Sequence, residues 1–553
     1  PAIAAASEER SSPPPAGLDA FGKGIWKSDL PPERCGIKVL GTPLGTPEFI
    51  NSFCQEVADE KMQLINRIPK LSSLQSSWLL LYFCVVPRIN HLLRTLPPQL
   101  VRAAAERHNS DVLALFRELF MIPGHRVWNT RMHGVSFGTW VKQSRLPLRL
   151  GGCGLRDAVR TRHAAYWASW ADCLPDLVRR FPSIRQGVLA QLSALQALDM
   201  DTHHVGGQYL VAAETAGKHC REHGWNDRPL WLDVASGLRP TQPSHDHTTL
   251  GEWQHGWQFH ASDSLERDAW NLLLQELALP SVRSNAVSSG KTRLRSCMGP
   301  FAAVWLTVCP SSDGLILPNW DLMFAMRRRL GIAVTYDGND VHGHSCFGDN
   351  TGGRLNVRHN MVLAAWRQVF FEAGGAVPDR NVERLLCDTN VPVHPDDLRR
   401  LDIIVPNLNV ERGLPIFGDV TVLAPLSANG EPRAGTSNQD GRLLELAETE
   451  NNDTYREVID SGLGSLQCLG CEVYGRWSTQ SVAMVPALAR ERSRGVHPRL
   501  RRGIALSLQH RWWGLLGIAV QRATAHVVRN QLAGVDLAQT QLEPIPPLAD
   551  VAC

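Results

Sequence analysis

The residues with the clearest chemical potential are two aspartates, Asp402 and Asp419, each of which adjoins an apolar run of β type. Sixteen residues separate them, and this stretch contains Asn407, Asn409 and Gly413, which is typical of a hairpin connection. Carboxylates on neighbouring strands can share a divalent cation such as Mg²⁺. A cation held in this way polarises a phosphodiester and lowers the pKa of an attacking water. The spacing therefore predicts a nuclease-like site at Asp402 and Asp419.

The elements that must position this pair form a small α/β unit. Apolar runs over 401–405 and 414–423 predict two strands, residues 441–448 predict a helix, and residues 471–474 predict a further strand. Cys468 and Cys471 form a CxxC pair without a second pair nearby, so we interpret them as core residues of a strand rather than metal ligands.

The preceding chain is different, because its apolar residues follow helical spacing. Residues 36–45 predict a strand and a turn, and residues 47–71 predict a helix. Two or three helices are expected over 72–119, where prolines interrupt the pattern, and the stretch 175–330 is expected to be mostly helical.

Composition narrows the class of protein. The 553 residues include 57 basic and 54 acidic side chains, so the net charge of +3 favours no particular partner. The 13 cysteines are scattered and odd in number, which indicates a reducing compartment rather than a disulfide framework. No apolar run approaches the ~20 residues of a membrane span. The start is rich in Ala, Ser and Pro and begins with Pro1, so the chain reads as a fragment or internal product with a flexible leader.

The distribution of charge is more informative than its sum. Residues 88–162 contain 13 basic and 4 acidic side chains, and residues 490–529 contain nine Arg and one acid. Such segments are suited to phosphate contacts, although a solvated helical surface, or a terminal helix that only closes the core, is the alternative. The candidate nucleic-acid-binding residues are Arg88, Arg94, Arg102, Arg145, Arg149, Arg499, Arg501 and Arg502.

The region 399–455 resembles the restriction-like endonuclease domain at the C-terminus of site-specific non-LTR retrotransposons, a PD-(D/E)xK-type nuclease. In that family an Arg-Pro-Asp segment supplies the first acid and an Asp-Val-Thr-Val strand supplies the second. Segment 399–402 matches the first motif with Leu401 in place of Pro, and segment 419–422 matches the second fully. The resemblance implies that Asp402 and Asp419 hold a catalytic Mg²⁺.

The family also has a Lys on the next helix, shortly before a Tyr, which assists the water. Glu448 and Tyr455 match this helix motif, but Asn451 occupies the position of the Lys. The chain has no Lys after Lys291, so no lysine elsewhere in this region can replace it. Asparagine hydrogen-bonds a water without supplying positive charge. Either Glu448 or Glu450 completes a variant metal site with Asn451 as a catalytic residue, or the domain binds without cutting.

Upstream, a segment containing His342 or His344, with Cys346 and His359, resembles the zinc knuckle that precedes the endonuclease domain in the same elements. The knuckle normally opens with a Cys pair, and residues 334–336 occupy that stretch here. Three ligands without a fourth are poor for structural zinc. We therefore expect a degenerate, metal-free turn rather than a zinc site at His344, Cys346 and His359.

Segment 36–45 is similar to the strand and turn that follow the catalytic palm of non-LTR reverse transcriptases, in the region of the primer grip. The basic helices after it would then correspond to the thumb. No Tyr/Phe-x-Asp-Asp segment occurs in the chain, so the palm aspartates that hold the polymerase metals are absent. We expect no complete RNA-directed DNA polymerase activity from this chain alone.

These observations predict an α+β multidomain chain, mostly helical in its N-terminal and middle parts, with a C-terminal α/β domain of restriction-endonuclease type. The expected divisions are a leader (1–34), a palm-end or primer-grip remnant (35–72), a basic thumb-like region (73–175), a helical connection (176–330), a degenerate knuckle-like segment and helix (331–375), the endonuclease domain (376–480), and Arg-rich C-terminal helices with a tail (481–553).

The resemblance implies a nucleic-acid-binding C-terminal part of a non-LTR retrotransposon reverse transcriptase and endonuclease. It implies Mg²⁺ as cofactor, target DNA and element RNA as partners, and a nuclear location. Mg²⁺-dependent nicking by a variant or decayed site is one reading. The other is a non-catalytic nucleic-acid-binding or scaffold protein derived from such an element.

Overall fold

The fold was analysed in a computed structural model, which describes residues 30–130, 134–182, 185–198, 208–240, 256–278, 289–334, 340, 342–347, 353–377 and 384–532. Most of the expected leader and the expected C-terminal tail lie outside these ranges. The described chain is mostly helical with small sheets, which confirms the α+β class. Within the same ranges, no helix combines the length and the apolar character that crossing a lipid bilayer requires.

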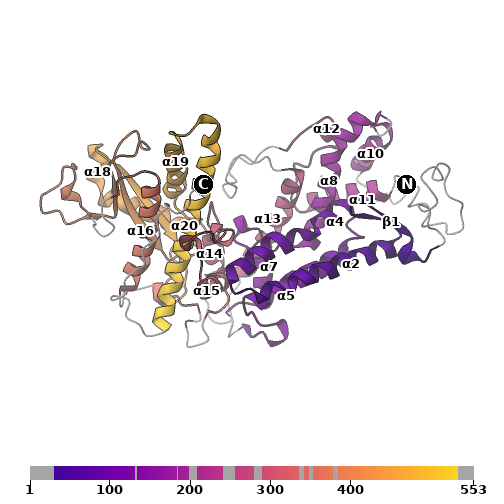
Figure 1. The fold of residues 1–553 in the computed structure, drawn as a ribbon, viewed down its shortest axis with the longest axis horizontal. Coiled ribbons are helices and arrows are strands. Elements are labelled where there is room, and N and C mark those ends of the chain that lie inside the picture. The colour runs from indigo at the N-terminus through magenta and orange to yellow at the C-terminus, as the bar shows by residue number, and fades with distance from the viewer. Residues whose placement is uncertain are drawn as a thin grey trace.

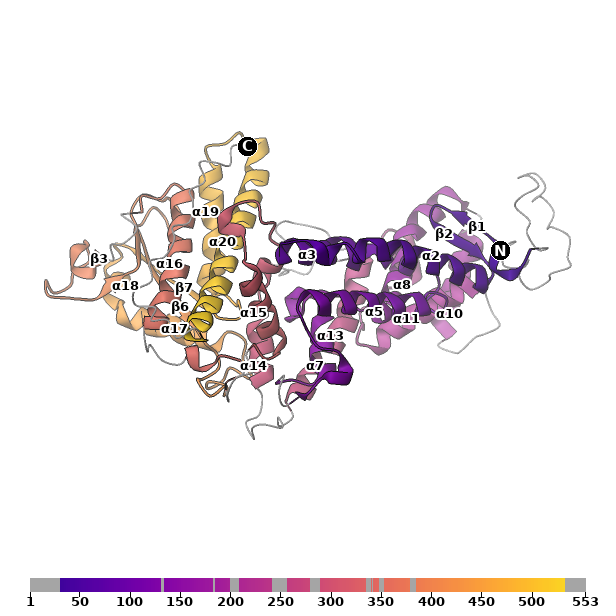
Figure 2. The same ribbon diagram turned by 60° about the horizontal axis from the view of Figure 1, so that its bottom comes forward.

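The molecule is elongated and consists of two lobes (Figure 1). One lobe contains the N-terminal helices, and the other contains the sheet and the C-terminal helices. Helices α14 (Ser289–Ser296) and α15 (Asn319–Leu330) lie between them in both views (Figure 2). The last described helix, α20 (Pro498–Leu532), contributes Ile518 to a core that also contains residues of the N-terminal helices.

The N-terminal lobe begins with the predicted strand and turn, which form a hairpin of β1 (Gly36–Val39) and β2 (Thr42–Gly45). Helix α2 (Pro47–Ile65) follows at once. Thr46 caps it by accepting a hydrogen bond from the Phe49 amide, and a proline in the first helical position lacks only an N–H that would have no partner there. The sequence prediction for this stretch is confirmed.

In the described part of this lobe, eight further helices form a bundle with α8. They are α3 (Leu74–Leu80), α4 (Asn90–Thr95), α5 (Arg102–Leu119), α7 (Phe137–Ser144), α10 (Ala190–Leu198), α11 (Gln208–Glu222), α12 (Trp231–Ala235) and α13 (Trp257–Leu277), with α8 spanning Ala158–Arg180. Trp167 of α8 is fully buried and lies against Trp225, Trp231 and Trp257 at centroid distances of 4.8, 5.1 and 5.9 Å. The burial of these large rings stabilises the bundle.

The main sheet of the C-terminal lobe has three strands in the order β5-β6-β7. They are β5 (Ile403–Val405), β6 (Ile416–Leu423) and β7 (Ser465–Glu472). Strands β5 and β6 are antiparallel, which confirms the predicted hairpin, whereas β6 and β7 are parallel and therefore need a crossover connection. Helix α17 (Arg442–Thr454) lies in this crossover, and the short α18 (Arg456–Ser461) follows it.

The two faces of β6 differ because side chains alternate along a strand. Val420 and Val422 belong to the same core as Trp366 of α16 (Arg354–Glu372). Phe417 lies on the opposite face with Tyr455. A two-stranded sheet of β3 (Arg384–Leu385) and β4 (Arg400–Leu401) leads into β5.

The Arg-rich C-terminal segment forms α19 (Thr479–Ser493) and α20, which pack against each other and, through α20, against α16. Trp512 is buried and donates to the Glu372 carboxylate at 2.7 Å, while Arg511 pairs with the same carboxylate at 2.9 Å. This part of the Arg-rich segment therefore packs in the core of the C-terminal lobe.

Candidate active site

Asp402 and Asp419 lie next to each other on the β5-β6 pair. Ile403 is paired with Gly418, so the next positions along the two antiparallel strands are Asp402 and Asp419. A hydrogen bond from the Val420 amide to Asp402 Oδ2, at 2.8 Å, fixes the first carboxylate against the second strand. The sequence prediction placed these two acids together, and the strand register is the reason that they meet.

Asp402 is also bound by α16. His359 Nε2 lies 3.0 Å from Asp402 Oδ2, and the Arg367 guanidinium donates to the Asp402 carbonyl at 2.9 Å. Burial lowers the pKa of His359, but the hydrogen bond and charge of Asp402, with smaller contributions from Asn360 and Asp419, outweigh burial and raise this pKa to about 9. His359 is therefore a cation at neutral pH, beside the first acid.

Asp419 has only neutral hydrogen-bond donors. Its Oδ2 accepts from Asn451 Nδ2 at 3.0 Å and from the Thr421 hydroxyl at 3.2 Å. Burial raises the pKa of the Asp419 carboxyl to about 6, and the negative charge of Asp402 adds to this effect, while Thr421 and His359 oppose it. A buried carboxyl whose ionisation is disfavoured by burial and by a neighbouring acid is a common feature of functional sites.

Asn451 occupies the place that the helix motif gives to a lysine, and its side chain does point at the second acid. Helix α17 presents it to Asp419, and the residue is buried. Tyr455 ends the same helix and donates to the Arg400 carbonyl at 2.5 Å, two residues before Asp402. Together these contacts anchor α17 to β6, which contains Asp419, and to β4, which directly precedes Asp402.

Glu448 points elsewhere. Its Oε1 accepts from Gln480 Nε2 at 2.6 Å, and Gln480 in turn accepts from the Cys468 amide at 2.5 Å. Within the described ranges, ligand atoms of Asp402, Asp419 and Glu448 do not all lie within 4.8 Å of one another. Glu450, the other acid considered, is exposed on α17. The structure thus brings together the aspartates and Asn451, and among the residues it describes no third carboxylate forms a ligand group with the two acids.

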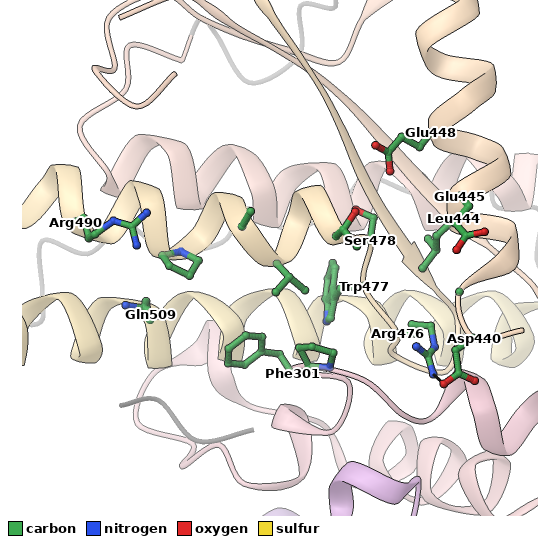
Figure 3. A pocket seen from close by; sticks show the side chains of 16 residues that line it. Phe301, Asp440, Leu444, Glu445, Glu448, Arg476, Trp477, Ser478, Arg490 and Gln509 are labelled. Atoms are coloured by element: carbon green, nitrogen blue, oxygen red, sulfur yellow. Dashed lines mark ion pairs between the residues drawn. The ribbon is translucent and has the colours of Figure 1, made fainter. Parts of the chain in front are cut away.

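Glu448 instead borders a cavity of about 700 Å³ between α17, α19 and α20 (Figure 3). Trp477 and Phe301 form its floor, Arg476 and Asp440 form an ion pair at 3.4 Å at one end, and Arg490 lies at the other end. Cys468 lies near Asp419, Asn451 and Glu448, so Glu448 connects the surroundings of the second acid with this cavity.

The residues of the knuckle-like segment do not gather around a common point. His359 is bonded to Asp402, and Cys346 is buried in the core of the C-terminal lobe. Among the residues that the structure describes, the ligand atoms of His344, Cys346 and His359 do not all lie within 4.8 Å of one another. Asp340 organises the turn instead, by accepting from the backbone amides of His344 and Ser345 at 2.8 and 2.7 Å.

The basic candidates of the N-terminal lobe are largely occupied by acids. Arg94 pairs with Asp172, Arg102 with Glu106 and Arg145 with Asp157, at 2.8, 2.9 and 3.2 Å, and Arg149 pairs with both Asp263 and Glu266. Several of these acids come from outside residues 88–162, so the local charge excess in the sequence overstates the charge that faces solvent.

Five candidates are exposed: Arg88 and Arg102 on the N-terminal lobe, of which Arg102 pairs with Glu106, and Arg499, Arg501 and Arg502 on the first turns of α20. The Arg501 guanidinium also donates to the Val496 carbonyl at 2.9 Å. These are the basic candidates with side chains placed to reach a partner.

Sequence reasoning missed the role of His359 and the contributions of Arg367 and Gln480. The sequence pattern suggests His359 as a zinc ligand, whereas it lies against an acid 43 positions later in the chain. No spacing rule signals this contact, because helix packing on the sheet creates it.

No protein-family model matches the chain, and no curated protein matches it either. The geometry of the site is accordingly the basis for any functional assignment.

Proposed function

We propose that the chain is the nucleic-acid-binding C-terminal part of a non-LTR retrotransposon protein, with a nuclear site of action on target DNA and element RNA. Its C-terminal α/β domain is a restriction-like endonuclease domain with a Mg²⁺-binding acid pair and weak nicking activity. The observation that supports this most is the convergence of Asp402 and Asp419 on paired strands, with Asn451 bonded to Asp419.

The acid pair fits a divalent cation. Mg²⁺ prefers one or two carboxylates and fills its other positions with water. The pKa of Asp419 is raised mainly because the carboxyl is buried, and also because Asp402 is negative, while His359 balances part of this effect. A bound cation would favour the charged form of Asp419. When bound, Mg²⁺ supplies Lewis-acid polarisation of the phosphate and a more acidic water. Asp402 and Asp419 would hold it.

The remaining residues of the site orient a water and the first acid, and they limit the rate of cleavage. The Asn451 amide can hydrogen-bond a water beside Asp419, but it supplies no positive charge. Loss of a charged water-activating group typically costs on the order of 10²–10⁴-fold in rate. Arg367 and His359 hold Asp402 from the α16 side, so the first acid stays in place when the neighbouring water exchanges.

The test compares nicking of supercoiled DNA in Mg²⁺ by the native chain, Asn451→Lys, and Asn451→Lys combined with Asp419→Ala. Asn452→Lys is the matched control, because it makes the same substitution one position along α17. We expect weak nicking by the native chain, an increase in Asn451→Lys but not in the control, and loss in the double variant. Cutting that survives Asp419→Ala would refute the assignment of the site.

A second candidate function is a non-catalytic nucleic-acid-binding or scaffold domain. The ion pair of His359 with Asp402 favours it, because an internal cation can replace a metal ion in stabilising the acids. It predicts DNA binding that Mg²⁺ does not change and nicking in none of the variants.

A further inference from the structure

A second group of potential metal ligands lies in the N-terminal lobe, far along the chain from the aspartate pair. His219 and His223 are four positions apart at the C-terminal end of α11, and Glu222 lies between them in sequence. Ligand atoms of these three residues all lie within 4.8 Å of one another, the only such group of His, Cys, Asp or Glu within the described ranges. Histidines at i and i+4 share one helix face.

A third histidine approaches from another helix. His163 of α8 lies against His219 with ring centroids 4.1 Å apart, and the His219 and His223 rings are 4.3 Å apart. His163 Nδ1 is buried and has no hydrogen-bond partner. A buried ring nitrogen without a partner is costly unless a ligand or water satisfies it.

The hydrogen bonding of His223 suits metal binding. His223 Nδ1 lies 2.8 Å from the His219 carbonyl, which only accepts, so Nδ1 carries the proton and Nε2 is left as the donor atom.

The surroundings contain both favourable and unfavourable charge. The C-terminus of α11 directs carbonyl dipoles at the group, which favours a cation, and the Glu222 carboxylate adds negative charge. Arg162 of α8 opposes this with its positive charge, although its guanidinium is directed to the Val159 carbonyl.

We propose that His219, Glu222 and His223 bind one zinc ion at the end of α11. His163 of α8, whose ligand atoms lie outside the 4.8 Å group, turns its ring toward the ion as the fourth ligand and so ties α11 to α8. Imidazole nitrogens with one carboxylate oxygen are a donor set that Zn²⁺ accepts in tetrahedral geometry. The site is separate from the knuckle-like segment and from the proposed Mg²⁺ site, and it does not depend on the proposed nuclease activity.

The test uses the full chain purified in chelator and titrated with Zn²⁺ against a competing chromophoric chelator. The variants are His219→Ala, His223→Ala, Glu222→Gln and His163→Ala. The matched control is His394→Ala combined with Asp396→Ala, which removes an exposed histidine and carboxylate 3.6 Å apart. Circular dichroism checks that each variant is folded.

We expect one Zn²⁺ per native chain and per control chain. Removing His219 or His223 should weaken binding by more than the roughly 10–100-fold that loss of an outer-shell partner costs. Native affinity in His163→Ala would overturn the assignment of the fourth ligand. Native affinity in His219→Ala and His223→Ala would overturn the site.

Co²⁺ substitution provides a readout that separates this site from the cysteines. A nitrogen and oxygen donor set should give visible absorption bands without thiolate charge-transfer bands, and these bands should disappear in His219→Ala. Charge-transfer bands that persist in this variant would show that thiols hold the metal and would refute the proposal.

Discussion

Two buried sites, one in each lobe, differ in how their charge is compensated away from water. In the N-terminal lobe, buried cations meet buried acids: Arg228 and Glu214 pair at 2.7 Å with both side chains 4% exposed. In the C-terminal lobe, Asp402 and Asp419 lie side by side, and the second acid has only neutral donors. Charge pairing of the first kind is expected in a scaffold, whereas adjacent like charges cost stability and are retained where a site uses them.

The comparison also shows that a charge excess in the sequence is a poor measure of a binding surface. Residues 88–162 have many more basic than acidic side chains, yet Arg94 and Arg149 are neutralised by acids of α8 and α13. The first turns of α20 form a much shorter segment than 88–162, but three of their arginines are exposed. Tertiary pairing decides which charges face solvent.

The largest effect is expected for Glu214→Ala. This variant leaves the Arg228 guanidinium buried without its acid and removes the partner of Trp231 Nε1, which lies 2.7 Å from Glu214. We expect the free energy of unfolding to fall by about 3–5 kcal/mol, measured in urea. Glu106→Ala, which breaks an exposed ion pair with Arg102, should cost at most about 1 kcal/mol. Equal losses in both variants would contradict the contrast between buried and exposed pairs.

The next largest effect is the change that His359→Gln causes in the pH dependence of the free energy of unfolding, measured in the presence of a chelator. The pKa of His359 in the native state is about 9, above its ordinary value, so the native state binds more protons than the unfolded state between about pH 6.5 and 9. The stabilisation is complete below pH 6.5 and is lost as pH rises to 9. It amounts to roughly 3 kcal/mol. His359→Gln should flatten the slope of unfolding free energy in this interval, and an unchanged slope would exclude the ion pair with Asp402.

A smaller effect, a gain rather than a loss of stability, is expected for Asp419→Asn without Mg²⁺. Because the native pKa of Asp419 is raised to about 6, the native state binds extra protons between about pH 4 and 6, and stability falls as pH rises through this range. At pH 7 the variant should therefore be more stable by about 1–2 kcal/mol. Asp453→Asn, at an exposed acid of α17, should show no gain. Destabilisation by Asp419→Asn would contradict the proposed crowding of negative charge.

The smallest effect on stability, and the sharpest on binding, is expected for Arg499→Ala, Arg501→Ala and Arg502→Ala combined. If these side chains neutralise DNA phosphates, the slope of log affinity against log salt should become shallower by about 0.9 for each phosphate that the variant leaves without its arginine. Arg145→Ala is the comparison, because its guanidinium is held by Asp157 and should leave the slope unchanged. An unchanged slope in the triple variant would remove α20 from the binding surface.

Much of the local structure was predictable from the sequence. The hairpin before α2 and the strands that contain Asp419 and follow Asp402 agree with the predicted elements, because hydrophobic period and turn residues are local properties. The helix predicted over 441–448 also forms, but it continues to Thr454 and so includes Asn451. The prediction of the last strand was less accurate, because β7 spans Ser465–Glu472 whereas the predicted strand covers 471–474. Strand β7 is buried along most of its length, so its residues do not alternate between apolar and polar.

The sequence by itself determined that two aspartates stand at neighbouring strands and that an asparagine lies on the helix that follows the second strand. Only the tertiary structure decided that His359 binds Asp402, that Glu448 turns to Gln480, and that His163 joins the histidines of α11. These contacts join residues 32 or more positions apart, and their geometry depends on how helices pack on the sheet and on each other. Local patterns specify which face a side chain takes, and packing specifies what that face meets.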